Sequence, residues 1–312
     1  MIKIIRYEPN MKSIWDNFLK NESRNVNFLF YRSYMDYHSD RFEDYSLLFY
    51  EEPDVLIGIM PANIKDETII SHQGLTYGGV VIKKNIGTEK VLSIFENIIK
   101  YLKDNSIKCF VYKKIPYIYN VQPYDEDLYA LFLFRFSLKI RDVSSAINLP
   151  NSSIKGKKVN GYKRALKSGF SLSESNDSSR VIDIVGKNLK DKYNLIPVHT
   201  SKELNLLKSR FPENIEFFEL VYEREIVGGA ILYLNEDIVH MQYITCKQEV
   251  KRLRGLDFLV LSIYKKFKDK YVWLNYGVST ENNGRFLNKS LIKSKEEFGF
   301  NAVCYDTYEI LI

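Results

Sequence analysis

Lys251-Arg252-Leu253-Arg254-Gly255 is the stretch that decides the fold, because of the elements that the sequence predicts on either side of it. Three apolar runs rich in β-branched and aromatic residues precede it, which predicts a three-strand meander at 217–222, 226–234 and 238–245. Apolar residues then recur at helical spacing in 256–270, and a short strand is expected at 272–276. This order, β-β-β-loop-α-β, presents strand amides to a carbonyl and helix N–H groups to an anion.

The first half of the chain repeats that order, which indicates a duplication. Four strands are expected there, at 45–50, 55–62, 68–71 and 108–112. A helix near 88–105 stands between the last two. We therefore expect an α/β fold of mixed α+β sheets, built from an N-terminal unit at 1–150 and a C-terminal unit at 170–312. The basic segment 151–169 is expected to join them as a linker or short helix.

Composition bounds the class of protein. At 312 residues and 45% hydrophobic content the chain is long enough for two cores, and no apolar run approaches the roughly 20 residues of a membrane span. The N-terminus lacks the layout of a signal peptide, so we expect a cytoplasmic protein. Three cysteines in apolar contexts show no metal spacing, so no metal is expected. The net charge of +6 suits an anionic small molecule such as coenzyme A and is too diffuse to indicate DNA.

Motifs in the second half resemble those of the FemAB-like acyltransferases, which are tandem GNAT-fold proteins. Residues 162–170 are similar to the basic helix and Ala-x-Lys-x-Gly step that opens the second half of that family. Residues 275–279 are similar to its aromatic-Gly-x-Ser step, and residues 291–299 to its closing Lys-x-x-Phe-Gly element. A terminal strand at 302–312 follows, as the resemblance implies, whereas the first half matches only in strand order.

The resemblance implies transfer of an acyl or aminoacyl group to an amine. Some members take the acyl group from a coenzyme A thioester, and the peptidoglycan-bridge members take an amino acid from aminoacyl-tRNA. The leading hypothesis is an N-acyltransferase, in the simplest case an N-acetyltransferase. It would use acetyl-CoA or another acyl-CoA and act on a nucleotide-linked amino sugar in bacterial surface-polysaccharide biosynthesis. The N-terminal unit would bind this acceptor and the C-terminal unit the donor. A tRNA-dependent aminoacyltransferase and a non-catalytic tandem-GNAT binding protein are the alternatives.

The donor loop follows from the same resemblance. GNAT proteins that bind coenzyme A carry Arg/Gln-x-x-Gly-x-Gly/Ala, and the first four positions of that motif fit 252–255. The expected donor-binding residues are Ile244, Thr245, Arg252, Arg254 and Gly255. Asp257 departs from the motif and would stand close to the pyrophosphate, as in a decayed loop, although an acidic residue in the first turn also suits the helix dipole.

Acyl transfer to an amine needs a base, a donor for the oxyanion and a proton source for the leaving group. Glu281, just past the last predicted strand, is the first choice for the base, with an exposed capping carboxylate as the alternative. His240 is the second candidate, with a structural histidine as its alternative, and Tyr243 completes the expected catalytic set. Strict alternation would place His240 and Gln242 on one face of their strand, and Met241 and Tyr243 on the other.

Two further regions are expected to contact the substrate. The glycine-rich stretch 71–79 permits close approach of a ligand, so His72, Gln73 and Tyr77 are expected to bind there, although a tight connection would also use glycines. In the second half His199, after an apparent helix end, and Gln242 are the expected substrate-binding residues. The partner is thus a small-molecule acceptor, and tRNA enters only under the alternative.

Overall fold

The computed structural model describes residues 2–312 and divides them into two compact units. Unit 1 comprises residues 2–143 with Thr280–Phe286 and Cys304–Ile312, and unit 2 comprises Ser144–Ser279 with Leu287–Val303. Both units are therefore interrupted in sequence, whereas the sequence predicted uninterrupted halves at 1–150 and 170–312. The difference arises because two strands, β9 (Ser137–Asn148) and β17 (Asn301–Leu311), have residues in both units.

Unit 1 contains two groups of paired strands, in the orders β1-β3-β4-β7 and β17-β8-β6-β5-β2. The strands are β1 (Ile2–Arg6), β2 (Glu43–Asp44), β3 (Leu47–Glu51), β4 (Val55–Met60), β5 (Asn63–Lys65), β6 (Thr68–Ile70), β7 (Val81–Ile82) and β8 (Cys109–Lys113). A short hairpin joins β15 (Thr280–Glu281) to β16 (Phe286–Leu287). The helices are α1 (Lys12–Asn17), α2 (Arg32–Met35), α3 (Thr88–Asp104) and α4 (Glu126–Leu133).

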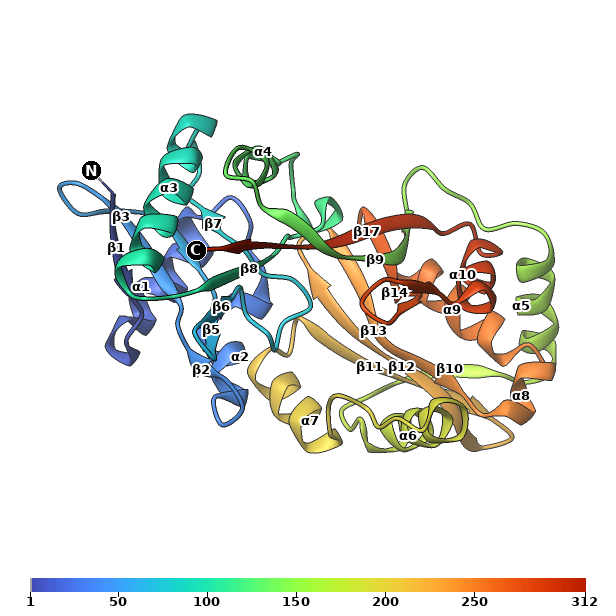
Figure 1. Cartoon of the computed structure of the whole chain (residues 1–312). Helices are drawn as coiled ribbons and strands as arrows, with labels where there is room; N and C mark the ends of the chain where they lie inside the picture. The colour runs from blue at the N-terminus through green and yellow to red at the C-terminus, as the bar shows by residue number, and fades with distance from the viewer. Residues whose placement is uncertain (1) are drawn as a thin grey trace. The chain divides into compact units, whose positions relative to one another are not determined.

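The core of unit 1 forms around α3, which packs against β1 (Figure 1). Its apolar residues Val91, Ile94, Ile98 and Leu102 recur at helical spacing and are fully buried. The helix connects β6 to β8, and these two strands pair in parallel. A parallel pair cannot be closed by a tight turn, so the crossover helix is what allows this arrangement.

Unit 2 contains one run of paired strands, in the order β10-β11-β12-β13-β14-β9. Its strands, besides β9, are β10 (Ser171–Ser175), β11 (Ile215–Tyr222), β12 (Glu225–Asn235), β13 (Ile238–Cys246) and β14 (Trp273–Val278). Its helices are α5 (Lys157–Lys167), α6 (Ser179–Tyr193), α7 (Ser201–Arg210), α8 (Gln248–Arg252), α9 (Gly255–Phe267) and α10 (Lys289–Glu296). The predicted meander, helix and final strand are therefore confirmed.

Alternation along β12 separates two layers of helices in unit 2. Ala230, Leu232 and Leu234 belong to the core that includes the apolar side chains of α9. On the other face a Cβ at Gly229 would stand 2.6 Å from the Val181 side chain of α6, so a glycine is what lets this helix lie so close. Figure 1 shows α6 and α7 along one face of these strands and α9 along the other.

The two units share an order of elements, as the duplication predicts. Leaving short strands aside, unit 1 runs β1-α1-α2-β3-β4-β6-α3-β8 and unit 2 runs β10-α6-α7-β11-β12-β13-α9-β14. In unit 1 β6 pairs in parallel with β8, with β7 and α3 between them in the chain, and in unit 2 β13 pairs in parallel with β14. The expected mixed α/β class is confirmed. Within 2–312, no helix combines the length and apolarity needed to span a bilayer.

Candidate active site

The two parallel strands of unit 2 separate at one point. Their register runs from Ile238↔Trp273 to His240↔Asn275 and ends there, although β13 continues to Cys246. Beyond Asn275, β14 pairs with β9 through an irregularity that includes Gly277, whose φ is +76°. The β13 backbone beyond His240 therefore has no ladder partner in β14. A parallel pair that opens in this way exposes strand amides to a ligand, as the sequence order predicted.

A β-bulge in β13 corrects the predicted distribution of side chains on its faces. Tyr243 pairs with Ile231 but Met241 pairs with the next residue, Leu232, so Gln242 is the extra residue. His240 pairs with Tyr233. Because Ile231 and Tyr233 lie on the same face of β12, His240 and Tyr243 share a face, so the prediction that Tyr243 lies on the face opposite His240 is wrong. The bulge brings both expected catalytic side chains to the α6 side.

His240 is held in one tautomer by a buried amide. The backbone N–H of Gly277 donates to Asn275 Oδ1 over 2.8 Å, which fixes the oxygen side of that amide. The opposite group, Asn275 Nδ2, donates to Ser144 Oγ over 3.0 Å. His240 Nδ1 lies 2.9 Å from the same Asn275 Oδ1, so Nδ1 must carry the hydrogen and Nε2 the lone pair. Asn275 and Ser144 are fully buried.

The surroundings of His240 keep its imidazole neutral. Burial lowers its pKa to about 4, and the positive charge of Lys295 adds to this effect, while the hydrogen bond to Asn275 opposes it. At neutral pH the imidazole is therefore uncharged, and its Nε2 atom carries a lone pair.

Lys295, from α10, is a buried cation beside the strand opening. Its Nζ donates to the carbonyl oxygens of Gly277 and Val278 over 2.7 and 3.0 Å, and it lies 5.3 Å from the centre of the Tyr276 ring. Burial lowers its pKa to about 7. Lys295 can therefore hold a proton and release it near neutral pH.

Tyr243, on the same face of β13, forms a partly buried pair with His199. The His199 backbone N–H donates to the Tyr243 oxygen over 3.2 Å, and His199 Nδ1 lies 3.0 Å from that oxygen. The Tyr243 oxygen therefore contacts both the backbone and the ring of His199. Burial raises the pKa of Tyr243, so its hydroxyl stays protonated at neutral pH. The structure thus brings together three of the residues that the sequence singled out, His199, His240 and Tyr243.

The expected donor-binding residues continue from the end of β13. Thr245 Oγ1 accepts a 2.7 Å hydrogen bond from Asn188 of α6, and its neighbour Ile244 is half-buried. Arg252 is exposed at the end of α8, and Gly255 begins α9. The first N–H groups of α9 have no carbonyl within the helix, as at every helix start. The short helix α8 stands between the end of β13 and the start of α9, where the sequence predicted a loop.

Asp257, the departure from the expected motif, has a structural role. Its carboxylate lies 3.3 Å from Lys158 Nζ of α5 and 3.2 Å from Arg254 Nη1. A Cβ at Gly161 would stand 2.1 Å from Asp257 Oδ2, so α5 and α9 meet at this point. The carboxylate is thus paired with two cations, and Arg254 is committed to it.

The expected substrate-binding residues of the glycine-rich stretch lie within unit 1. His72 is buried with its ring stacked on His38, 5.1 Å between ring centres, and burial lowers its pKa to about 3. Tyr77 is buried and accepts a 2.8 Å hydrogen bond from Asn27. The Gln73 backbone N–H donates to an asparagine side chain over 2.6 Å. His72 and Tyr77 are therefore part of the packing of unit 1, whereas Gln73 is exposed.

Glu281 lies exposed on β15, which belongs to unit 1, whereas His240 belongs to unit 2. Its neighbour Thr280 donates to Asp142 Oδ1 over 2.6 Å and accepts from the Val143 backbone N–H over 3.1 Å. These bonds fix the strand that carries Glu281. Its role as a base stays a prediction.

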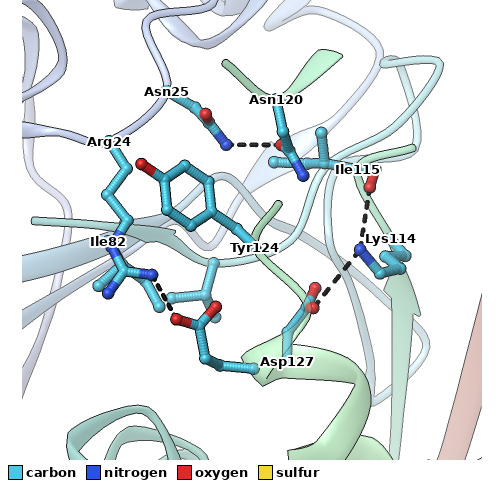
Figure 2. A pocket seen from close by; sticks show the side chains of 10 residues that line it. Arg24, Asn25, Ile82, Lys114, Ile115, Asn120, Tyr124 and Asp127 are labelled. Atoms are coloured by element: carbon cyan, nitrogen blue, oxygen red, sulfur yellow. Dashed lines mark hydrogen bonds and ion pairs between the residues drawn. The ribbon is translucent and has the colours of Figure 1, made fainter. Parts of the chain in front are cut away.

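A polar pocket of about 370 Å³, which includes open solvent, lies in unit 1 (Figure 2). Its charged groups already pair with one another: Arg24 Nη1 lies 2.7 Å from Glu126, and Lys114 Nζ lies 3.5 Å from Asp127. A ligand would have to displace these contacts. None of the expected catalytic, donor-binding and substrate-binding residues named above lines this pocket.

Sequence reasoning did not assign Asn275, Ser144 or Lys295 to the site. Asn275 and Lys295 stand in the motifs that carry the family resemblance, so a signal was present for both. Ser144 stands in no motif, and only the fold brings it to Asn275. Among residues 2–312, no group of three or more His, Cys, Asp and Glu side chains is arranged to hold a metal ion.

The comparisons with known proteins concern the fold. No family model and no curated protein matches the sequence. FemX matches with a TM-score of 0.68 and 8% identity, over 99% of this chain and 97% of that one. The C-terminal domain of a protein described as lysylphosphatidylglycerol synthetase, from Agrobacterium fabrum, matches at 0.60 and 12%, over 97% and 92%. A tandem GNAT protein from the clavulanic acid pathway matches at 0.53 and 9%, over 100% and 98%.

These matches span nearly the whole of each chain, and at such low identity they establish the fold. The chain has the FemAB-like, tandem GNAT fold of acyltransferases. The resemblance found in the sequence motifs and the comparison of structures agree on this class.

Proposed function

We propose that the chain is an acyl-CoA-dependent N-acyltransferase, with acetyl-CoA as the simplest donor. The acceptor is the amine of an amino sugar in nucleotide-linked form, and the product enters bacterial surface-polysaccharide biosynthesis. The observation that carries the proposal is the opening between β13 and β14, where a neutral His240, a buried Lys295 and a strand edge without a ladder partner occur together. The acceptor class rests on the family resemblance.

The donor site of the proposal is the end of β13 and the start of α9. A thioester arm is an amide-containing chain, which can hydrogen-bond to the β13 backbone beyond His240. The pyrophosphate would accept hydrogen bonds from the first N–H groups of α9, with Arg252 as its charged partner. Asp257 does not oppose this, because Lys158 and Arg254 already pair with its carboxylate.

Acyl transfer requires one group that accepts a proton from the amine and one group that donates a proton to the thiolate. As the amine nitrogen bonds to the thioester carbonyl it becomes positively charged and acidic, so even a weakly basic imidazole can accept its proton at Nε2 of His240. The C–S bond then breaks and the thiolate takes a proton, for which Lys295 or Tyr243 is the source. Glu281 stays the alternative base.

Calorimetry with acetyl-CoA tests the donor site. Arg252→Ala should weaken binding about 5- to 150-fold, because a charge-assisted contact contributes roughly 1–3 kcal/mol. Arg135→Ala, an exposed arginine of unit 1, is the matched control and should leave the dissociation constant unchanged. An unchanged constant for Arg252→Ala would remove Arg252 from the donor site, and no heat with the native chain would remove acetyl-CoA as donor.

A second candidate function is the transfer of an amino acid from aminoacyl-tRNA. The match to FemX favours it, because FemX gives a TM-score of 0.68 over nearly the full length of both chains. The net charge of +6 is small for tRNA binding, which argues for the coenzyme A thioester. Incubation with labelled acetyl-CoA and with labelled aminoacyl-tRNA in parallel separates the two. Absence of both transfer and donor binding would instead favour the non-catalytic alternative.

A further inference from the structure

The loop between α6 and α7 exposes aliphatic side chains in succession. Leu195 is 58% exposed, Ile196 85% and Val198 77%. Single exposed aliphatic residues are common on protein surfaces, but three within four positions form a contiguous apolar tip. We call residues 195–198 the apolar loop.

The apolar loop is fixed at both ends. Asn194, in the left-handed conformation, ends α6, and a capping box between Thr200 and Glu203 begins α7. Pro197 points inward, because a Cβ at Gly186 of α6 would stand 3.7 Å from its ring. His199 also points inward, to Tyr243. Ile196 and Val198 alternate in sequence with Pro197 and His199, so their side chains point outward.

Lysines flank the apolar loop on both sides in the sequence. Residues 187–202 contain four lysines and a single aspartate, Asp191. Lys190 and Lys192 are exposed on the last turn of α6, and Lys202 is exposed on the first turn of α7. The α8 residue Lys251 lies near this group, because the positive charge of Lys192 acts with burial to lower the pKa of Lys251. An exposed apolar tip with exposed lysines on both sides matches an anionic lipid surface, whose headgroups attract the cations while the tip enters the acyl region.

We propose that the apolar loop binds the chain reversibly to the surface of an anionic lipid bilayer. The site comprises Leu195, Ile196 and Val198 as the inserted side chains and Lys190, Lys192 and Lys202 as the headgroup contacts. A second copy of the chain could also cover this surface, but the lysines of the two copies would then face one another and repel. The proposal goes beyond acyl transfer and does not depend on it.

Co-sedimentation with vesicles tests the proposal. The full chain should bind vesicles of equimolar phosphatidylcholine and phosphatidylglycerol and should bind pure phosphatidylcholine at least about tenfold more weakly. Ile196→Ser with Val198→Ser should weaken binding to the anionic vesicles by about tenfold or more, since two aliphatic side chains no longer leave water. Lys190→Gln with Lys192→Gln should weaken binding to the anionic vesicles severalfold. Added salt should remove the difference in binding between this lysine variant and the native chain.

Phe132→Ser is the matched control, because Phe132 of α4 is 78% exposed and lies in unit 1. It should leave vesicle binding unchanged. The proposal is overturned if the native chain does not sediment with anionic vesicles, or if Phe132→Ser weakens binding as much as the loop variant. It is also overturned if sedimentation velocity shows a dimer that the loop substitutions dissociate and vesicles leave intact.

A gain-of-signal variant covers the case in which the serine variant fails to fold. Ile196→Trp keeps a large apolar side chain, and its fluorescence should shift to the blue with anionic vesicles and be quenched by brominated lipid. An unchanged spectrum would refute insertion of the loop. These experiments contain no acyl donor or acceptor. A negative result would therefore say nothing about the proposed transfer reaction, and absence of that reaction would say nothing about vesicle binding.

Discussion

At the scale of single residues, hydrogen bonds from amide groups determine which nitrogen of His240 carries the hydrogen. The Gly277 backbone N–H orients the Asn275 amide, and that amide orients the His240 imidazole. Ser144 completes the chain on the other side. A change at Asn275 should therefore act on catalysis through the tautomer of His240 and not through contact with substrate.

The choice between the two candidate bases can be decided by paired substitutions. If Glu281 accepts the amine proton, Glu281→Gln should lower turnover about 100-fold or more with little change in donor affinity, and higher pH should partly rescue it. If His240 does so, His240→Ala should have that effect and Glu281→Gln should be near native. Rates measured from pH 6 to 10 distinguish these outcomes, and neither variant slowing the reaction would exclude both residues.

Lys295 gives the reaction a second pH signature. Its pKa of about 7 means that the ammonium form is lost as pH rises through neutrality. If this ammonium supplies the proton to the leaving group, turnover should fall above about pH 7. Lys295→Arg should then lower turnover at neutral pH and remove that alkaline fall, since arginine does not release its proton in this range. An unchanged alkaline limb in this variant would assign the proton source to Tyr243.

His72 links pH to stability. Its folded pKa of about 3 lies below the ordinary value of 6.5, so the unfolded chain binds this proton first as pH falls. The stability that the neutral imidazole contributes is present above pH 6.5 and is lost progressively towards pH 3. Urea unfolding should show a loss of roughly 1–2 kcal/mol between pH 7.5 and 5 that is absent in His72→Asn. An equal loss in that variant would assign the effect to other groups, among them His240.

At the scale of elements, the contact between α5 and α9 shows why Asp257 replaces the small residue of the expected motif. The carboxylate occupies the space over Gly161 and binds Lys158 from the facing helix. The charge therefore ties two helices together at the start of α9. Substitutions at this contact should change stability, with any effect on the donor loop following from it.

Gly161→Ala tests the contact directly. A Cβ would stand 2.1 Å from Asp257 Oδ2, so the variant should lose about 1–3 kcal/mol of unfolding free energy, measured in urea. Gly87→Ala is the control, because no atom lies within 4 Å of the added Cβ, and it should change stability by a few tenths of a kcal/mol. If both alanines behave alike, the close approach of the two helices is not as described.

Sequence patterns were sufficient for the elements and insufficient for their pairing. Alternation and helical spacing predicted β11 to β14 and α9, since each pattern is local to its own element. The bulge at Gln242 depends on the register with β12, and the burial of Lys295 depends on where α10 packs. Neither can be read from local spacing, so the face shared by His240 and Tyr243 and the cluster around Asn275 emerged only from the fold.

At the scale of the whole molecule, no single cut near the middle of the sequence separates the two compact units. Within unit 1, β8 pairs with β17, as in Thr307↔Lys113. Within unit 2, β14 pairs with β9, as in Trp273↔Asn148. The predicted boundary at residue 150 missed this because strand pairing between distant segments leaves no mark in composition.

A fragment of residues 1–150 should therefore fail to fold cooperatively, since β8 would keep a long apolar edge without its partner. Its thermal unfolding by circular dichroism should be broad and without a clear midpoint. A peptide of residues 301–312 should restore a cooperative transition, and a scrambled peptide of the same composition should not. A sharp transition of the fragment alone would show that β17 is dispensable.

The pairing of β8 with β17 also sets an order of events during synthesis. The partner of Lys113 is Thr307, which the ribosome adds almost at the end of the chain. At a synthesis rate of about 5 to 20 residues per second this leaves roughly 10 to 40 seconds between the two residues. Throughout that interval the nascent unit 1 carries an open strand edge, so a folding chaperone that shields such edges should be found on ribosomes that translate this message.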